Sequence, residues 1–271
     1  MMRIRTLVKV GLSLFVLALG LIGVSYTMLR AQGVANPSTT AGRVTRTEVR
    51  DIGHGITAID LQGPIDLTLR QGSTPSLKVV GEQRLLGNVA TSQEDGTLRI
   101  ATTGMLFHHK RPLQVEAVLP SLQEVEIRGS GDSAISGFSG ERLTITLNGS
   151  GNLSFSGRYR HVKAAVHGNG GLDLKSGSGE DMQLALYGSG SISASGTCKE
   201  LEAELTGSGT IDAQHMASNT VSVEVKGSGT TEVFARETAA IAIAGSGDVT
   251  VYGNPDQRSV SRTGSGDVSF E

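Results

Sequence analysis

A short glycine-flanked triplet, Gly-Ser-Gly or Gly-Asn-Gly, recurs eight times at nearly constant spacing through the second half of this 271-residue chain. The triplets begin at Gly129, Gly149, Gly168, Gly188, Gly207, Gly227, Gly245 and Gly264, in steps of 20, 19, 20, 19, 20, 18 and 19 residues. Such a period is typical of a solenoid, in which each repeat forms one coil stacked on the previous one. The spacing therefore predicts a repetitive fold.

Apolar residues alternate with polar ones on both sides of the triplets. Leu143, Ile145 and Leu147 precede the second triplet at intervals of two, and Leu153 and Phe155 continue the alternation after it. This period of two is typical of a β-strand with one buried face. We therefore predict an all-β fold, a single parallel β-helix with about 19–20 residues and two corners in each coil, and eight such coils.

The triplet glycines are predicted to form one corner of every coil. Glycine reaches positive φ without a Cβ clash and lets neighbouring backbones come close. The predicted turn glycines are Gly129, Gly131, Gly149, Gly151, Gly168, Gly170, Gly188, Gly190, Gly207, Gly209, Gly227, Gly229, Gly245, Gly247, Gly264 and Gly266.

Two departures from the repeat carry further predictions. The extra triplet at 177–179 is out of register and is predicted to form the opposite corner of its coil. In the last repeat Arg258 and Arg262 occupy inward positions. Charge there indicates a cap that blocks an open sheet edge, and a shift of register at the last repeat is the alternative.

The amino-terminal residues are typical of a targeting segment. Arg3, Arg5 and Lys9 precede an uncharged run of twenty residues, 10–29, which is long enough to cross a bilayer as a helix. The basic flank predicts a cytoplasmic amino terminus and an exported remainder. We expect an anchor in the inner membrane with the solenoid in the periplasm, or a periplasmic or secreted protein if the segment is cleaved.

The expected organisation has three parts. Residues 1–30 are the hydrophobic signal or anchor helix, and residues 31–50 a polar tether. Residues 51–271 form the solenoid, with irregular first coils over 51–112 and regular repeats over 113–271. The segment 104–112 is expected to be a loop off one coil.

Composition argues against several classes of function. The 24 basic and 26 acidic residues nearly balance, and no basic cluster follows the leading segment, so nucleic-acid binding is not expected. Cys198 is the one cysteine, which excludes an internal disulfide and a cysteine-based zinc cage. We expect it to have an ordinary role near a loop.

Cofactor and metal sites are likewise not expected. The triplets lack the third glycine of a dinucleotide-binding motif, and the six histidines show no ligand spacing. Aspartate follows the triplet at Asp132, Asp248 and Asp267, and the last two lie in adjacent coils. A calcium site between those two is one option, and a turn-stabilising role is the favoured one.

Two outward features bear on function. Glu204 and Glu224 share an outward position in consecutive coils, as a polysaccharide-cleaving β-helix enzyme would require, although a solvated face is the favoured interpretation. Immediately before the triplets lies a mixed polar and aromatic row, which could contact a glycan or another protein and is equally typical of the polar side of a sheet. We call this row the contact column, and it consists of Arg128, Asn148, His167, Tyr187, Thr206 and Lys226.

Three stretches together carry a family resemblance. They are Gly-Pro-Ile-Asp-Leu-Thr-Leu-Arg-Gln-Gly at 63–72, Asp-Gly-Thr-Leu-Arg-Ile at 95–100, and the Gly-Ser-Gly repeats. In these the chain resembles the bacterial head GIN domain family from about Asp51 to Glu271. The resemblance implies a β-solenoid on an exported protein that serves surface adhesion, and it brings no catalytic residues.

Three functions are therefore considered. The first is a non-catalytic β-solenoid of the cell envelope that binds an envelope protein, a glycan or a second copy of itself. The second is an envelope carbohydrate-active enzyme, and the third is a structural spacer without a ligand. We expect the first.

Overall fold

The computed structural model describes residues 44–103 and 112–271. Residues 45–271 form one compact unit. Its strands are β1 Thr45–Arg50, β2 Ala58–Gln62, β3 Ile65–Gln71, β4 Ser76–Glu82, β5 Val89–Glu94, β6 Thr97–Thr102, β7 Leu113–Leu119, β8 Glu124–Gly129, β9 Ser133–Gly149, β10 Asn152–Gly168, β11 Gly171–Ser178, β12 Asp181–Gly188, β13 Ser191–Gly207, β14 Thr210–Gly227, β15 Thr230–Gly245, β16 Asp248–Tyr252, β17 Gln257–Gly264 and β18 Val268–Phe270. The helix α2, Gln83–Leu86, is a single turn.

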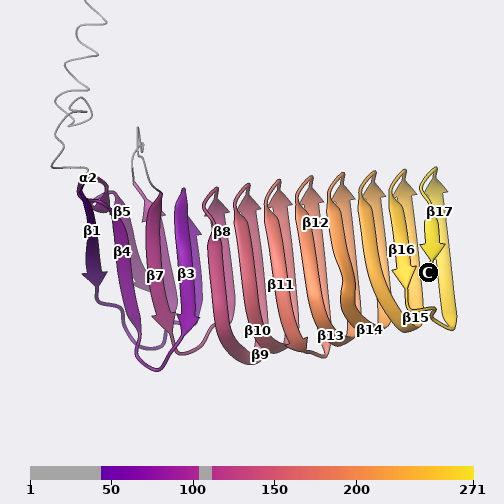
Figure 1. The fold of residues 1–271 in the computed structure, drawn as a ribbon, viewed down its shortest axis with the longest axis horizontal. Coiled ribbons are helices and arrows are strands. Elements are labelled where there is room, and N and C mark those ends of the chain that lie inside the picture. The colour runs from indigo at the N-terminus through magenta and orange to yellow at the C-terminus, as the bar shows by residue number, and fades with distance from the viewer. Residues whose placement is uncertain (1–43, 104–111) are drawn as a thin grey trace, which may run out of the picture. The chain divides into compact units, whose positions relative to one another are not determined.

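From β8 onward the chain winds as a solenoid of parallel strands (Figure 1). The first glycine of each triplet pairs with the first glycine of the next, from Gly129 with Gly149 through to Gly245 with Gly264. The predicted column of glycine corners is thus confirmed. The eight glycine corners mark the ends of about seven complete turns. The solenoid therefore has about one coil fewer than the eight predicted.

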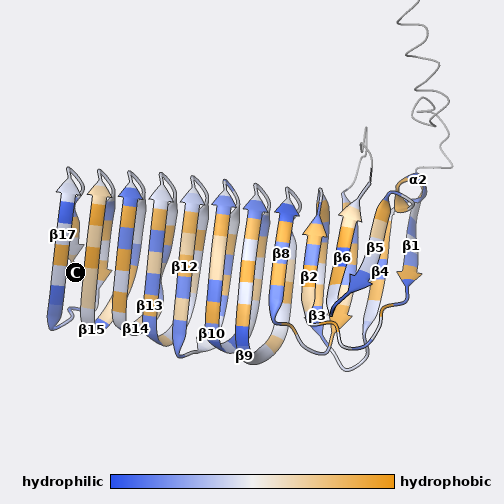
Figure 2. Ribbon diagram, turned by 180° about the vertical axis from the view of Figure 1, so that it is seen from behind, coloured by the Kyte–Doolittle hydropathy of each residue, from blue (hydrophilic) through white to orange (hydrophobic). Residues whose placement is uncertain are grey.

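The interior of the coils is apolar and mainly aliphatic, as the alternation predicted. Leu143, Ile145 and Leu147 are each 0 % exposed, and Leu153 and Phe155 are buried in the next coil. Figure 2 shows the same alternation as blue and orange segments along each strand. Since every inward position lies beside the inward positions of the adjacent coils, the buried side chains form continuous columns.

The part before β8 is not wholly parallel, which corrects the expectation of a single parallel solenoid. β2 and β3 pair in parallel with β8 and β9 like ordinary coils, but β4 pairs antiparallel with β1 and β7, and β5 antiparallel with β6. Asp95 and Gly96 join β5 to β6 with φ values of 49° and 75°. Positive φ at both residues of a two-residue loop is the signature of a tight β-hairpin, which forces antiparallel pairing.

The segment expected as a tether contributes a strand. Thr45–Arg50 form β1, which covers the edge of β4, so residues 45–50 belong to the folded unit. Arg50 donates hydrogen bonds to the carbonyl oxygens of Val89 and Leu86, and thereby ties β1 to the turn that follows α2. The hydrophobic run 10–29 and the expected loop, apart from Pro112, lie outside the described residues. Within the described ranges no helix has the length and hydrophobicity to span a membrane.

At the last coil the register continues without a shift. Arg258 pairs with Ala239 and Arg262 with Ile243, both buried, so the two arginines do occupy inward columns. Arg258 stacks over the ring of Phe270 at 4.4 Å from its centroid. Arg262 donates hydrogen bonds to the carbonyl of Gly266 and to the carboxylate of Asp267. The continuous pairing excludes the shifted register, and it places two charged residues at the inward positions of the last coil, as the capping interpretation requires.

Each coil bends a second time, opposite the triplet corner. In the coil formed by β11 and β12 this bend is a break at Gly179 and Glu180, which confirms the prediction for the extra triplet. In β9, β10 and β13 the strand runs through the bend with a shift of register against its neighbour. Cys198 lies just beyond this bend in β13, buried beside Ser218. It belongs to a strand and not to a loop, and burial raises the pKa of its thiol.

Tyr159 lies at the second bend of β10 and joins two coils. Its ring passes beneath Gly140, where an added Cβ would lie 2.8 Å from the ring carbon Cε1. Its hydroxyl donates a hydrogen bond of 2.7 Å to the carbonyl of Leu122, and the side chain is almost fully buried. Burial raises the pKa of Tyr159 to about 12.

Replacement of Tyr159 by phenylalanine should lower the free energy of unfolding by about 1–2 kcal/mol at neutral pH, because the carbonyl of Leu122 loses its partner. The difference in unfolding free energy between the wild type and this variant should become smaller as the pH rises from 10 to 12. The wild-type tyrosine keeps its proton when folded and loses it more readily when unfolded, so its stabilising contribution is lost through this range. Urea unfolding of both proteins across that range measures the difference, and a constant deficit would contradict the assigned pKa.

Candidate functional site

The contact column forms one continuous row on the outward face. Its six members pair in order across successive coils, as Arg128, Asn148, His167, Tyr187, Thr206 and Lys226. All six side chains are exposed or half-buried. The six residues therefore do lie side by side across the coils, because each one directly precedes a glycine corner and the corners are in register.

At the centre of the column two aromatic rings are stacked. The rings of His167 and Tyr187 lie 4.8 Å apart at their centroids and only 9° from parallel. The Tyr187 hydroxyl donates a 2.9 Å hydrogen bond to Glu204, and this bond, followed by burial, raises the pKa of Tyr187. The adjacent outward positions in these two coils are Ala165 and Ala185, so small side chains lie beside the pair. The pair is thus exposed, held in one geometry, and free of bulky neighbours on that side.

The two ends of the column are occupied by ion pairs. Arg128 bonds to Asp60 at 2.9 Å and also pairs with Glu126, which in turn accepts a hydrogen bond from Asn148. Lys226 lies 2.8 Å from Glu224, whose hydrogen bond raises the pKa of the lysine. The charged side chains at both ends of the column are therefore paired with carboxylates of the same chain.

The carboxylates of the enzyme alternative are joined to this network. Glu204 and Glu224 do lie side by side, as predicted, between Ala185 and Ala242. Lys226 contacts both of them, at 3.9 Å and 2.8 Å, and Glu204 also accepts the hydrogen bond from Tyr187. A general acid and base need to face a substrate, whereas these two groups face a shared cation.

The aspartates that follow the triplets stabilise turns. The carboxylate of Asp248 accepts the amide hydrogen of Asp267 in the next coil at 3.2 Å, and Asp267 itself pairs with Arg262. The backbone amide of Asp132 donates an analogous hydrogen bond to the carboxylate of Asp66. These bonds support the turn-stabilising interpretation over a calcium site. Across residues 44–103 and 112–271, no three His, Cys, Asp or Glu side chains gather in a way that could hold a metal ion.

Ion pairs also cross the coils near the second bend. Arg160 bridges Glu141 at 3.3 Å and Glu180 at 2.9 Å, and Lys199 of the following coil reaches Glu180 at 3.1 Å. Hydrogen bonds from Arg160, then from Lys199, lower the pKa of Glu180 to about 2. His161 lies between Glu141 and Asp181. These ion pairs, which we call the ion-pair ladder, link successive coils at the surface. His161 takes part in them as a polar partner of two carboxylates.

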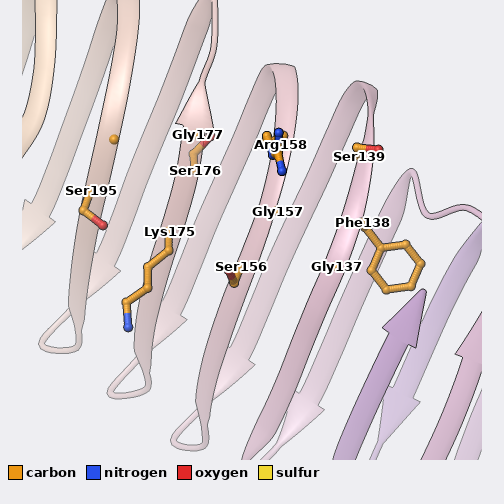
Figure 3. A pocket seen from close by; sticks show the side chains of 11 residues that line it. Gly137, Phe138, Ser139, Ser156, Gly157, Arg158, Lys175, Ser176, Gly177 and Ser195 are labelled. Atoms are coloured by element: carbon orange, nitrogen blue, oxygen red, sulfur yellow. The ribbon is translucent and has the colours of Figure 1, made fainter. Parts of the chain in front are cut away.

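A groove that no sequence motif predicted runs along the second bend. It has a volume of about 660 Å³ and is lined by residues of β9, β10, β11 and β13 (Figure 3). Its glycines are Gly137, Gly157, Gly177 and Gly196, at steps of 20, 20 and 19 residues. This second glycine period could have indicated the second bend from the sequence. The residues around these glycines differ from coil to coil, and the register shifts at the bends, so the glycines do not belong to one repeated motif.

Besides the glycines and Phe138, the lining of this groove consists of four hydroxyl groups and two cations. The hydroxyls belong to Ser139, Ser156, Ser176 and Ser195, and the cations to Arg158 and Lys175. The groove is thus polar and positively charged, unlike the contact column.

Comparisons with solved structures show that this fold is shared. A protein of Parabacteroides distasonis ATCC 8503 named as a putative lipid binding protein is 23 % identical with a TM-score of 0.77, and the match covers 84 % of this chain and 96 % of that one. A putative adhesin of the same organism is 20 % identical with a TM-score of 0.78, covering 85 % and 98 %. A putative adhesin of Parabacteroides merdae ATCC 43184 is 21 % identical with a TM-score of 0.77, covering 84 % and 96 %. At these identities the likeness establishes the fold alone.

Among curated proteins none shows significant similarity to this chain. The sequence profile of one family matches residues 55–255, most of the folded unit. This confirms the resemblance seen in the sequence: the chain belongs to the family described as "Putative auto-transporter adhesin, head GIN domain".

Proposed function

We propose that this protein is an exported, non-catalytic binding module of the cell envelope, whose contact column recognises a surface partner, either an envelope protein or a glycan. The family description and the names of two of the structural neighbours support a role in adhesion. Export rests on the basic residues and the apolar run at the amino terminus. The run either anchors the protein in the inner membrane or is removed as a signal.

The observation that carries the proposal is the stacked pair of His167 and Tyr187. Both rings lie on strand segments that are paired on both sides, and the Tyr187 hydroxyl is oriented by Glu204. Side chains already held in one geometry lose little entropy when a partner binds. Tyrosine is also among the residues that contribute most to binding at protein surfaces.

A double substitution of His167 and Tyr187 by alanine tests the proposal. Bacteria that display the full chain should lose adhesion to their target surface, and the affinity for the partner should fall at least tenfold, as expected for the loss of an aromatic hot spot. A matched control replaces Ser154 and Ser193 by alanine; both are exposed and lie on the strand segments that follow the triplet corners, away from the contact column. This control should adhere normally.

The result also decides between the alternatives. If the double variant keeps its fold, as judged by circular dichroism, and adheres normally, the contact column is not needed for adhesion. That result would favour the structural-spacer hypothesis. Cleavage of an envelope polysaccharide that is lost in both Glu204→Gln and Glu224→Gln would favour the enzyme.

A further inference from the structure

The groove at the second bend, which we call the bend groove, differs in charge from its surroundings. Arg158 and Lys175 are the ionisable side chains in its lining, and both are basic. The acidic residues of the neighbouring ladder, among them Glu141 and Glu180, do not line it. The groove therefore offers two positive charges on adjacent coils to an incoming group.

Arg158 is held in place but has no counter-ion among the described residues. Its aliphatic stem crosses Gly177 of the next coil, where an added Cβ would lie 2.7 Å from Cγ of the arginine. Among the residues that the structure describes, none forms a hydrogen bond or ion pair with its guanidinium. Lys175 pairs with Asp173 at 3.2 Å, and both side chains of that pair are well exposed. An exposed pair of this kind contributes little, so Lys175 can exchange its partner at low cost.

The remaining groups in the bend groove suit a hydroxylated ligand. Ser156, Lys175 and Ser195 lie in one column across three coils, and Ser139 and Ser176 line the groove beside it. No other described residue is a hydrogen-bond partner of these four hydroxyls. A serine hydroxyl donates one hydrogen bond and accepts two, which matches the hydroxyl groups of a sugar. Figure 3 shows these side chains coming from successive coils along the groove.

The dimensions indicate an extended chain. Four strands contribute to the bend groove, and three steps of about 4.8 Å between them give a length of roughly 14 Å. That coil step is close to the length of one sugar unit in an extended polysaccharide, so each sugar would face one coil. A planar guanidinium binds a carboxylate through two parallel hydrogen bonds, which favours an acidic sugar at Arg158.

We propose that the bend groove binds a carboxylated oligosaccharide, with Arg158 on a sugar carboxylate, Lys175 supporting it electrostatically, and the serine hydroxyls on the sugar hydroxyls. The site lies on a different surface from the contact column and does not depend on partner binding there. It gives the protein a second contact, with a defined class of ligand.

Isothermal titration of the purified full chain with trigalacturonate tests this site. We expect a dissociation constant below about 1 mM that weakens as salt is added. Arg158→Ala should reduce the affinity at least tenfold, and Arg158→Lys should restore part of it. The matched control is Arg236→Ala, because Arg236 is also exposed and without a described partner, yet lies in β15 outside the groove. It should bind like the wild type.

Three results would overturn the inference. One is equal binding of maltotriose, a neutral trisaccharide, which would exclude a role for the sugar's charge. Another is unchanged affinity in Arg158→Ala. A third is complete displacement of trigalacturonate by inorganic phosphate at equal concentration, which would define a general anion site. The double variant of His167 and Tyr187 should still bind trigalacturonate, so loss of the proposed adhesion and loss of this site can be told apart.

Discussion

Replacement of Gly207 by alanine should lower the free energy of unfolding by roughly 3–5 kcal/mol. Gly207 has a φ of +128°, where any other residue is strained, and an added Cβ would overlap the carbonyl of Gly188 in the preceding coil. That carbonyl accepts the amide hydrogens of both Ser208 and Gly209, at 3.0 and 3.2 Å. Relief of the overlap would therefore break the bonds that close the corner. Urea denaturation of the full chain, followed by far-ultraviolet circular dichroism, measures the loss.

The middle residue of the same triplet provides the control. Ser208 is exposed, and its replacement by alanine should change stability by no more than about 0.5 kcal/mol. A loss below about 1 kcal/mol for Gly207→Ala would show that the corners have room for a side chain. The close stacking of glycine backbones would then not be what keeps the coils in register.

Replacement of Leu205 by alanine should cost about 2–5 kcal/mol. Leu205 is 0 % exposed and lies in an inward column between Leu186 and Val225 of the adjacent coils. The cavity would be bounded by two coils that are themselves fixed by backbone hydrogen bonds, so the structure can close it only partly. Because the coils contact only their neighbours, hydrogen exchange should increase first in β12, β13 and β14.

Thr206, the next residue along β13, points outward and serves as the matched control. Its replacement by alanine should leave stability within about 0.5 kcal/mol of the wild type. Uniform loss of protection along all coils in Leu205→Ala would contradict a fold stabilised by nearest neighbours and would indicate a single cooperative core.

Local regularity explains which features were predictable. Burial restricts a position to apolar residues, and positive φ restricts it to glycine. The alternation from Leu143 to Phe155 and the repeated glycines therefore reveal the buried positions and the corners directly. The contact column followed directly, since its members immediately precede the glycine corners. The arginines of the last coil were also placed correctly by counting along the same repeat.

The hairpin from Val89 to Thr102 could have been found but was not. Asp95-Gly96 between two alternating stretches is a strong signal for a tight antiparallel turn. The surrounding sequence was interpreted as further coils, and the assumption of one uniform fold outweighed that local signal. β1 was missed for another reason: most of its residues are exposed, so no buried alternation reveals it.

The coil, its period, its interior and the corner at which each coil turns all follow from residue types that recur at fixed intervals along the chain. The way in which the second bends fit together depends on packing between coils, because the register shifts differ from coil to coil and depend on the neighbouring strand. The bend groove, with Arg158 in its lining, and the ion-pair ladder through Glu180 both lie at these bends. The glycines of the groove recur at steps of about 20 residues, but Arg158 and Lys175 are not repeated at the equivalent positions of the adjacent coils.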